Sequence, residues 1–101
     1  MELKVTYAGG KRFEASARNH KVLSDQPLDD DGTDVGMTPP ELFLASLGTC
    51  MGYYAVEYLK ARDLKTDGLE VRVSAAKGGK PVRIGHVSGV IDPRWSPAGV
   101  R

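Results

Sequence analysis

The sequence predicts one α+β domain in which short antiparallel strands flank a single long helix. Apolar residues alternate with polar ones over residues 3–7 and 13–17, which is typical of strands with one buried face. A helical pattern with a clear start covers residues 38–62, and a second alternating segment follows Gly68. At 101 residues the chain is long enough for one domain.

The N-terminal strands are expected to form an antiparallel meander. Apolar residues occupy one face of the first strand, and Gly9–Gly10 supplies a turn into the second. A further turn at Asn19–His20 leads to a short third strand at Val22–Leu23. Residues 25–37, which include five aspartates, are expected to be a solvent-exposed loop.

The long helix has a well-defined start. Thr38 is the expected N-cap, Pro39 suits the first helical position, and Glu41 completes a capping box. The helical pattern runs to about Arg62. Two apolar rows cover much of its surface, so this helix is expected to be buried on several sides, by a sheet and by another subunit. The first row is Leu42, Ala45, Ser46, Thr49, Tyr53, Val56 and Leu59, and the second is Phe43, Leu47, Cys50, Tyr54 and Tyr58.

A C-terminal β-hairpin is expected after the helix. Its first strand, residues 69–75, has apolar residues at alternate positions, and Gly78–Gly79 supplies the turn. The apolar phase of the second strand shifts near Gly85, which indicates a β-bulge. His86, beside this shift, is interpreted as an exposed strand histidine. Ser96–Pro97 is a helix-start pair, so the domain is interpreted as short at its C-terminus.

Composition and charge argue against several classes of protein. The formal net charge is +1 and no basic patch is interleaved with aromatic residues, so nothing indicates nucleic-acid or membrane-surface binding. No segment resembles a membrane span or an export signal. One cysteine and two histidines without short spacing argue against zinc, and no phosphate loop or dinucleotide fingerprint occurs. No metal and no cofactor are therefore expected, and the unpaired cysteine favours a reducing cytoplasm.

Cys50 is the strongest candidate for chemistry. A thiol reacts as the thiolate, which needs a nearby positive charge, and Cys50 lies about three turns into its helix, too deep for the helix dipole to help. The candidate cations are Arg12, Arg18 and His20. Glu41 is nine residues away from Cys50. That spacing gives about 13.5 Å of rise and about 180° of rotation, so the two cannot easily touch on a straight helix.

The helix period predicts an apolar pocket with phenolic edges around Cys50. The residues on its stripe are Phe43, Ser46, Leu47, Tyr53, Tyr54 and Glu57. Such a pocket suits a small lipophilic molecule, for example a peroxide, rather than a sugar or a nucleotide. From the residues alone two interpretations stay open: Cys50 is a reactive thiol, or it is packed and inert, with Glu41 acting only as a cap.

Residues 39–50 resemble the central-helix signature of the OsmC/Ohr family. They read Pro-Pro-Glu-Leu-Phe-Leu-Ala-Ser-Leu-Gly-Thr-Cys. Weaker matches elsewhere extend the resemblance over nearly the whole chain; they are Arg18-Asn19-His20, Asp25-Gln26-Pro27 and Pro81-Val82-Arg83-Ile84. The chain resembles the broad branch of uncharacterised OsmC-like proteins more than the well-studied hydroperoxide reductases.

The resemblance implies an OsmC-like α+β fold and an intertwined homodimer with active sites at the subunit interface. It implies that Cys50 attacks an organic hydroperoxide and becomes a sulfenic acid. An arginine of the N-terminal sheet assists, for which Arg18 is the first choice and Arg12 the second. A glutamate at the helix start also assists, and Glu41 is the candidate. In the well-studied branch the acid lies one residue further from the cysteine, where this chain has Pro40.

The family's second, resolving cysteine lies on a C-terminal helix beyond the region where this chain ends. The resemblance therefore implies that the sulfenic acid needs an external thiol or over-oxidises, and that the chain is a fragment or a natural short form. The predicted function is a thiol-dependent peroxidase that reduces organic hydroperoxides. The alternatives are a non-enzymatic OsmC-like protein that binds a small lipophilic ligand, and an inactive structural fragment. The expected substrate-binding residues are Phe43, Leu47, Tyr53 and Tyr54.

Overall fold

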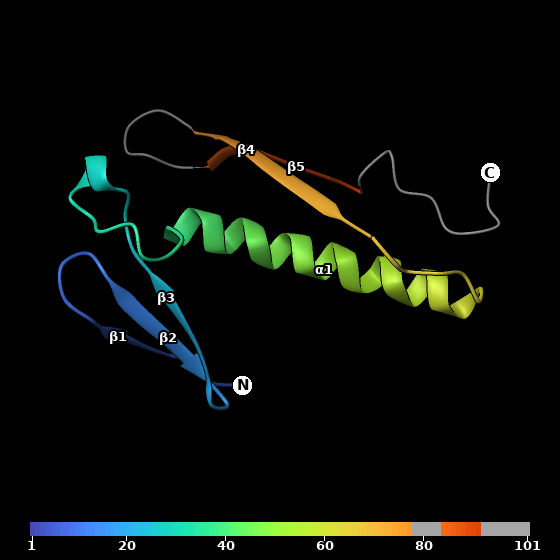
Figure 1. Ribbon diagram of the computed structural model, residues 1–101, viewed down its shortest axis with the longest axis horizontal. Helices are drawn as coiled ribbons and strands as arrows, with labels where there is room; N and C mark the ends of the chain where they lie inside the picture. Colours follow the sequence, from blue (N-terminus) through green and yellow to red (C-terminus); the bar gives the residue numbers. More distant parts are fainter. Residues whose placement is uncertain (78–83, 92–101) are drawn as a thin grey trace. The chain divides into compact units, whose positions relative to one another are not determined.

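The computed structural model describes residues 1–77 and 84–91. In these residues the chain forms the strands β1, β2 and β3, a short 3-10 helix η1, the long helix α1, and the strands β4 and β5 (Figure 1). This element order confirms the predicted α+β class. The chain divides into two compact units, Met1–Leu42 and Phe43–Arg101. Within the described ranges, no helix combines the length and the apolar character that crossing a membrane requires.

The N-terminal unit contains a three-stranded antiparallel meander. β1 (Lys4–Tyr7) pairs with β2 (Phe13–Ala17), and β2 pairs with β3 (His20–Ser24). Successive residues of each strand point to opposite sides of the sheet, while paired residues share a side. One side is mainly polar, and the other carries the apolar residues Val5, Tyr7, Phe13, Ala15 and Val22. The predicted meander is confirmed.

The turn between β2 and β3 lies at Arg18 and Asn19, so the prediction of a turn at Asn19–His20 was wrong by one residue. Both turn residues have positive φ, 48° for Arg18 and 71° for Asn19. Two-residue turns with this backbone match the twist of the strands they join, and His20 then pairs with Ala17 as the first residue of β3. Because the left-handed region is unusual for arginine, Arg18 is a strained turn residue rather than an ordinary strand residue.

Residues 25–37 form a compact loop around a buried carboxylate. Asp25 is only 1% exposed. Its Oδ2 accepts hydrogen bonds from the Thr33 N–H at 3.1 Å, the Thr33 hydroxyl at 2.5 Å and the Val35 N–H at 3.3 Å. Its Oδ1 accepts one from the Gln26 N–H at 2.7 Å. The prediction of a solvent-exposed loop was therefore wrong for Asp25, because the loop folds its own N–H groups around this side chain.

The same hydrogen bonds change the acidity of Asp25. The Thr33 hydroxyl has the largest effect, burial opposes it, and the backbone N–H groups reinforce it, so that the pKa of Asp25 is lowered from 3.8 to about 2. The loop contains η1 (Leu28–Asp30), and its ends are joined by a hydrogen bond of 3.1 Å from the Asp25 N–H to the Met37 carbonyl. A loop closed in this way fixes the path of the chain into α1.

α1 (Pro39–Ala61) has well-defined caps at both ends. At its start, the Glu41 carboxylate accepts hydrogen bonds from the Thr38 N–H at 2.8 Å and from the Thr38 hydroxyl at 3.0 Å. In return, the Glu41 N–H donates to Thr38 Oγ1 at 3.3 Å, which confirms the predicted capping box. At its end, Asp63 adopts a left-handed φ of 58° and the last turn closes with Schellman-type hydrogen bonds.

In the second unit, β4 (Val71–Lys77) pairs antiparallel with β5 (Ile84–Ile91). The register shifts between Ala76 and Lys77 so that Gly85 is passed over, which confirms the bulge predicted there. Three predictions concern residues outside the described ranges: the turn at Gly78–Gly79, the strand position Val82 and the helix start at Ser96–Pro97.

β4 lies along α1 on a face of small residues (Figure 1). A Cβ atom at Gly48 would lie 3.1 Å from Val73 Cγ2, and one at Gly52 would lie 3.8 Å from Val71 Cγ2. The two glycines are about one helical turn apart, so together they let the strand approach the helix backbone closely. Leu59, which is 5% exposed, lies on the same side of α1 and continues this packing face.

Candidate functional site

Cys50 lies in the middle of α1, and its side chain is exposed. It is two residues away from Gly48 and two from Gly52. Two residues correspond to about 200° of rotation on an α-helix, so Cys50 projects from the side of α1 opposite to the one that contacts β4. Cys50 is therefore not part of the packing between α1 and β4, and its sulfur is open to small molecules.

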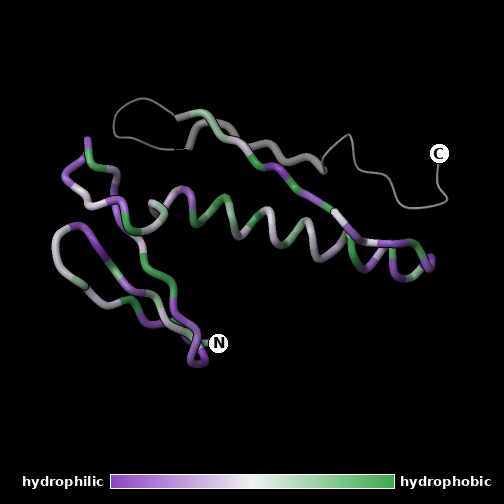
Figure 2. Tube along the Cα trace, viewed as in Figure 1, coloured by the Kyte–Doolittle hydropathy of each residue, from purple (hydrophilic) through white to green (hydrophobic). Residues whose placement is uncertain are grey.

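Large apolar side chains surround Cys50 on what we call the thiol face, which comprises Phe43, Leu47, Cys50, Tyr53 and Tyr54. All lie within about 60° of Cys50 around the helix axis. Phe43 is 52% exposed, Tyr53 60% and Tyr54 67%. The two tyrosine rings meet edge to face, with centroids 5.3 Å apart and planes at 74°. The predicted substrate-binding residues thus share one face with the thiol, on a helix whose middle runs from hydrophobic to near neutral (Figure 2).

Glu41 lies in the first turn of α1. Its carboxylate is bonded to the Thr38 N–H and hydroxyl in the capping box. On the continuous helix α1 it is nine residues before Cys50 and about half a turn of rotation away from it. The structure therefore shows Glu41 acting as a cap, and its role as an acid beside Cys50 stays a prediction.

The candidate cations differ in the hydrogen bonds and ion pairs that they make within the N-terminal unit. Arg12 donates from Nη1 to the Thr33 hydroxyl at 3.2 Å, and its Nη2 lies 3.0 Å from the position of a Cβ at Gly9. The Arg18 guanidinium is exposed at its turn and makes no hydrogen bond or ion pair with another residue in the described ranges. His20 is the exposed first residue of β3. Arg18 is thus the more available guanidinium, and its pairing with Cys50 stays a prediction.

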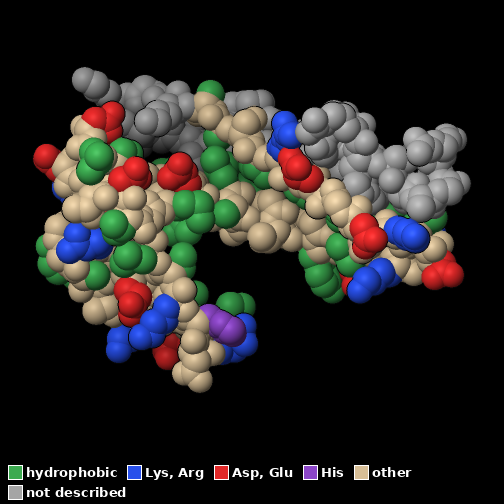
Figure 3. Space-filling model, in the orientation of Figure 1, with side chains coloured by type: hydrophobic (Ala, Val, Ile, Leu, Met, Phe, Trp, Pro, Cys, Tyr) green, Lys and Arg blue, Asp and Glu red, His purple; other side chains and the backbone are tan. Residues whose placement is uncertain are grey.

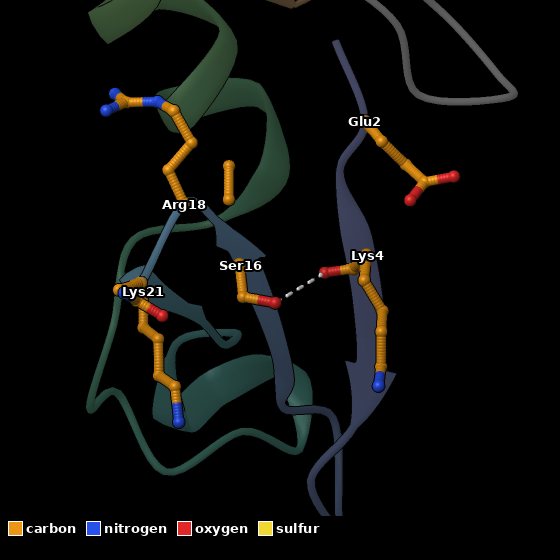
Figure 4. Close-up of a pocket in the computed structure, with 7 residues that line it drawn as sticks. Glu2, Lys4, Ser16, Arg18 and Lys21 are labelled. Carbon is orange, nitrogen blue, oxygen red and sulfur yellow. Dashed lines mark hydrogen bonds between the residues drawn. The ribbon is translucent and has the colours of Figure 1, made fainter.

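Arg18 also lines an open polar pocket at one end of the meander (Figure 4). The pocket has a volume of about 260 Å³, and its lining residues are Glu2, Lys4, Ser16, Ala17, Arg18, Asn19 and Lys21. Three of these side chains are cationic and one is anionic, so the lining favours negatively charged ligands. Sequence reasoning singled out only Arg18 in this group.

Sequence reasoning missed two further features, the buried Asp25 and the packing role of Gly48 and Gly52. An aspartate that directly follows a strand and precedes a loop with glycine and threonine is typical of a carboxylate that binds loop N–H groups. Two glycines one turn apart, in a helix otherwise rich in large residues, indicate close approach of another element. Both signals are present in the sequence, but the residues that contact Asp25, Gly48 and Gly52 are known only from the structure.

Comparisons with known proteins identify relatives of this sequence and of this fold. The sequence matches the family of OsmC-like proteins over residues 30–93. The fold is similar to the crystal structure of a Psychrobacter arcticus 273-4 protein described as an osmotic stress induced and detoxification response protein, with a TM-score of 0.80 and 26% identity. That match covers 88% of this chain and 66% of the other, so this chain spans just under two thirds of that protein's length. No curated protein matches the sequence.

Proposed function

The chain belongs to the family of OsmC-like proteins, and from this we propose that it is a thiol-dependent peroxidase that reduces organic hydroperoxides at Cys50. The observation that carries the proposal is the exposed thiol among Phe43, Leu47, Tyr53 and Tyr54, on the side of α1 that β4 leaves open. An apolar surface with an accessible sulfur suits a lipophilic peroxide, because the organic group can be desolvated while the peroxide oxygen meets the thiol. A role in detoxification, as in the description of the Psychrobacter arcticus protein, fits this chemistry.

The proposed reaction balances with an external dithiol as reductant. The Cys50 thiolate attacks one peroxide oxygen, the O–O bond breaks, and Cys50 becomes a sulfenic acid. The leaving alkoxide takes the proton that the thiol had released and departs as the alcohol. One thiol of the dithiol then forms a mixed disulfide with Cys50 and releases water. The second thiol displaces Cys50, which returns as a thiol while the reductant leaves as a disulfide. The chain contains one cysteine, so the resolving thiol in this scheme comes from outside it.

Arg18 is proposed to supply the positive charge that a reactive thiolate requires. Two observations support it over Arg12: its guanidinium has no partner in the described part of the chain, and its backbone is held at a φ of 48°. The left-handed backbone of Arg18 costs some stability, and functional sites are where such strain occurs, while its exposed guanidinium is open to an anionic partner. Glu41 is proposed only as a secondary contributor, since the cap already engages its carboxylate.

We also propose that the chain forms a homodimer, intertwined as the family resemblance implies. Within each chain, β4 and β5 are proposed to be joined as a hairpin. Both units expose large apolar side chains, on the thiol face of α1 and on the apolar side of the meander. Figure 3 shows such side chains on the surface of each. Exposed apolar patches of this kind mark contact surfaces. Light scattering after size exclusion should give twice the mass of one chain, and a monomer at micromolar concentration would contradict the dimer.

The decisive experiment measures consumption of cumene hydroperoxide with dithiothreitol as the reductant. We expect catalysed turnover in the wild type and a loss of at least about a hundredfold in Cys50→Ser, because a hydroxyl cannot replace the thiolate. Thr49→Ser is a matched control on the same helix and should retain activity. Unchanged circular dichroism would show that Cys50→Ser is folded. Turnover that survives in Cys50→Ser would exclude the proposed nucleophile.

A second outcome separates the enzyme from a binding protein. If the wild type consumes no peroxide but quenches its tyrosine fluorescence saturably with a lipophilic ligand such as cumyl alcohol, the thiol face is a ligand-binding surface. Phe43→Ala should then weaken binding, because Phe43 is one of the large exposed rings beside Cys50. If the chain shows neither turnover nor saturable binding, a structural fragment is favoured and the proposed function is overturned.

A further inference from the structure

We propose that the N-terminal unit binds a small oxyanion, a phosphate or carboxylate group, between Lys4 and Lys21. The strand register carries the argument. Lys4 of β1 pairs with Ser16 of β2, and Ser16 pairs with Lys21 of β3. Paired residues in an antiparallel sheet share a side, so the two lysines lie on one side of the meander with Ser16 between them. The site is built from Lys4, Ser16 and Lys21, and it needs neither Cys50 nor Arg18, the cation proposed above for Cys50.

The spacing of the two lysines suits a single oxyanion. Two strand intervals separate them, which corresponds to about 9.6 Å between their backbones. Figure 4 shows the two side chains extending in the same direction on either side of Ser16. Lysine side chains are long enough for both ammonium groups to converge on an anion above Ser16. The Ser16 hydroxyl is available as a further donor, because its present hydrogen bond to the Lys4 carbonyl is long, at 3.5 Å.

The charges around this position are poorly compensated. The pocket of about 260 Å³ is lined by the cations Lys4, Arg18 and Lys21, and Glu2 is the one carboxylate in its lining. Lys21 has an ion pair with Glu14 at 3.7 Å, with side chains 66% and 43% exposed. Ion pairs this long and this exposed contribute little. The Lys4 ammonium has no hydrogen bond or ion pair with any residue in ranges 1–77 and 84–91.

These observations favour an anion over other occupants. Lys4 and Lys21 repel one another across Ser16, and a bound oxyanion would relieve that repulsion while taking hydrogen bonds from several donors. Ser16 and Asn19 add neutral donors, which orient an oxyanion without adding charge. The sequence offers no extended basic surface with aromatic residues, so a discrete anion group fits better than a nucleic-acid backbone.

The test is a titration followed by amide chemical shifts in ¹H–¹⁵N spectra. Inorganic phosphate and sodium acetate are added in separate arms at constant ionic strength, with chloride as the balancing ion. We expect saturable shifts at Lys4, Ser16 and Lys21 with at least one of the two anions. Lys4→Gln and Lys21→Gln should each weaken binding by about three- to tenfold, since each removes one charge-assisted contact at an exposed site.

Two further variants make the test specific. Glu2→Gln removes the one negative side chain of the pocket lining, so it should strengthen binding. Lys11→Gln makes the same charge change in the exposed turn between β1 and β2 and should leave binding unchanged. The stronger of the two arms identifies the anion as phosphate or carboxylate. Shifts that do not saturate, or that weaken equally in Lys11→Gln and Lys4→Gln, would show general screening and overturn the site.

Discussion

The loop at residues 25–37 and the thiol face of α1 differ in how fully the fold uses their reactive side chains. In the loop, the Asp25 carboxylate is 1% exposed and accepts four hydrogen bonds. On the thiol face, Cys50 is exposed and its neighbours Tyr53 and Tyr54 are more than half exposed. One polar group is thus surrounded by partners, while the other lies on an apolar surface that the described residues of its own unit leave uncovered.

This contrast separates the structural role of Asp25 from the chemical role that we propose for Cys50. A carboxylate whose acceptor positions are filled by N–H and O–H groups holds a loop and has little capacity left for a ligand. A thiol without a packing role, next to aromatic rings that a soluble surface would not ordinarily expose together, is available for binding and reaction. The comparison predicts that changes at Asp25 act on stability, and that changes on the thiol face act on activity.

The largest stability effect is expected for Asp25→Asn. The amide oxygen can replace only one carboxylate oxygen, and its NH₂ group would face a backbone N–H, so at least one buried donor loses its partner. We expect the melting temperature at pH 7 to fall by about 5–10 °C, measured by circular dichroism. Asp30→Asn, on the exposed part of the same loop, is the matched control and should change it little. An unchanged melting temperature in Asp25→Asn would refute the structural role.

The pH dependence of this difference follows from the lowered pKa of Asp25. Because its folded-state value of about 2 is below the ordinary value of 3.8, the ionised side chain stabilises the fold fully above about pH 4. That stabilisation is lost as the pH falls from about 4 toward 2, where Asp25 takes up a proton. The gap in melting temperature between wild type and Asp25→Asn should therefore narrow over this range. A gap that stays constant down to pH 2 would mean that the carboxylate charge is not what holds the loop.

A smaller effect on stability is expected for Gly48→Leu, on the side of α1 that contacts β4. A Cβ at this position already lies 3.1 Å from Val73 Cγ2, so the rest of a leucine side chain would push β4 away. Overpacking costs about 1–3 kcal/mol, and leucine's better helix propensity offsets about 1 kcal/mol of it. Thermal unfolding should show a drop of a few degrees. Ser46→Leu, near the thiol face, should show none, and equal drops would mean that the two faces are not distinct.

Local patterns predicted much of this fold from the sequence. The capping box of Thr38 and Glu41 depends on two residues of one turn, and it was predicted with its partners. The meander and the bulge at Gly85 follow from alternation and from a shift of its phase. Each of these features is decided by residues close together in the chain, so the sequence alone contains the necessary information.

Features that depend on distant contacts could not be predicted in the same way. Asp25 is held by Thr33 and Val35, eight and ten residues further along. An aspartate after a strand favours contacts with loop N–H groups, but the sequence does not say which residues supply them. The exposure of Cys50 depends on which side of α1 meets β4. The two apolar rows of the helix allow either side, and the small residues Gly48 and Gly52 decide which side it is. They leave Cys50 exposed, while its reactivity stays a prediction.

The smallest predicted effect concerns Glu57, the one charged residue between Leu42 and Leu59 of α1. It follows Cys50 by seven residues, so it lies about 10.5 Å along the axis and about 20° around it, on the side of the thiol. Like charges repel, and over this distance physiological salt screens most of the repulsion between Glu57 and an anionic sulfur. Glu57→Gln should therefore speed alkylation of Cys50 by iodoacetamide by less than about twofold. The control is Glu70→Gln, which removes the charge of a carboxylate paired with Arg72 and should leave the alkylation rate unchanged.

A slower reaction in Glu57→Gln would have the wrong sign for simple repulsion. It would mean that Glu57 holds the cation that activates Cys50, and the thiol face would then be a charged site rather than an apolar one.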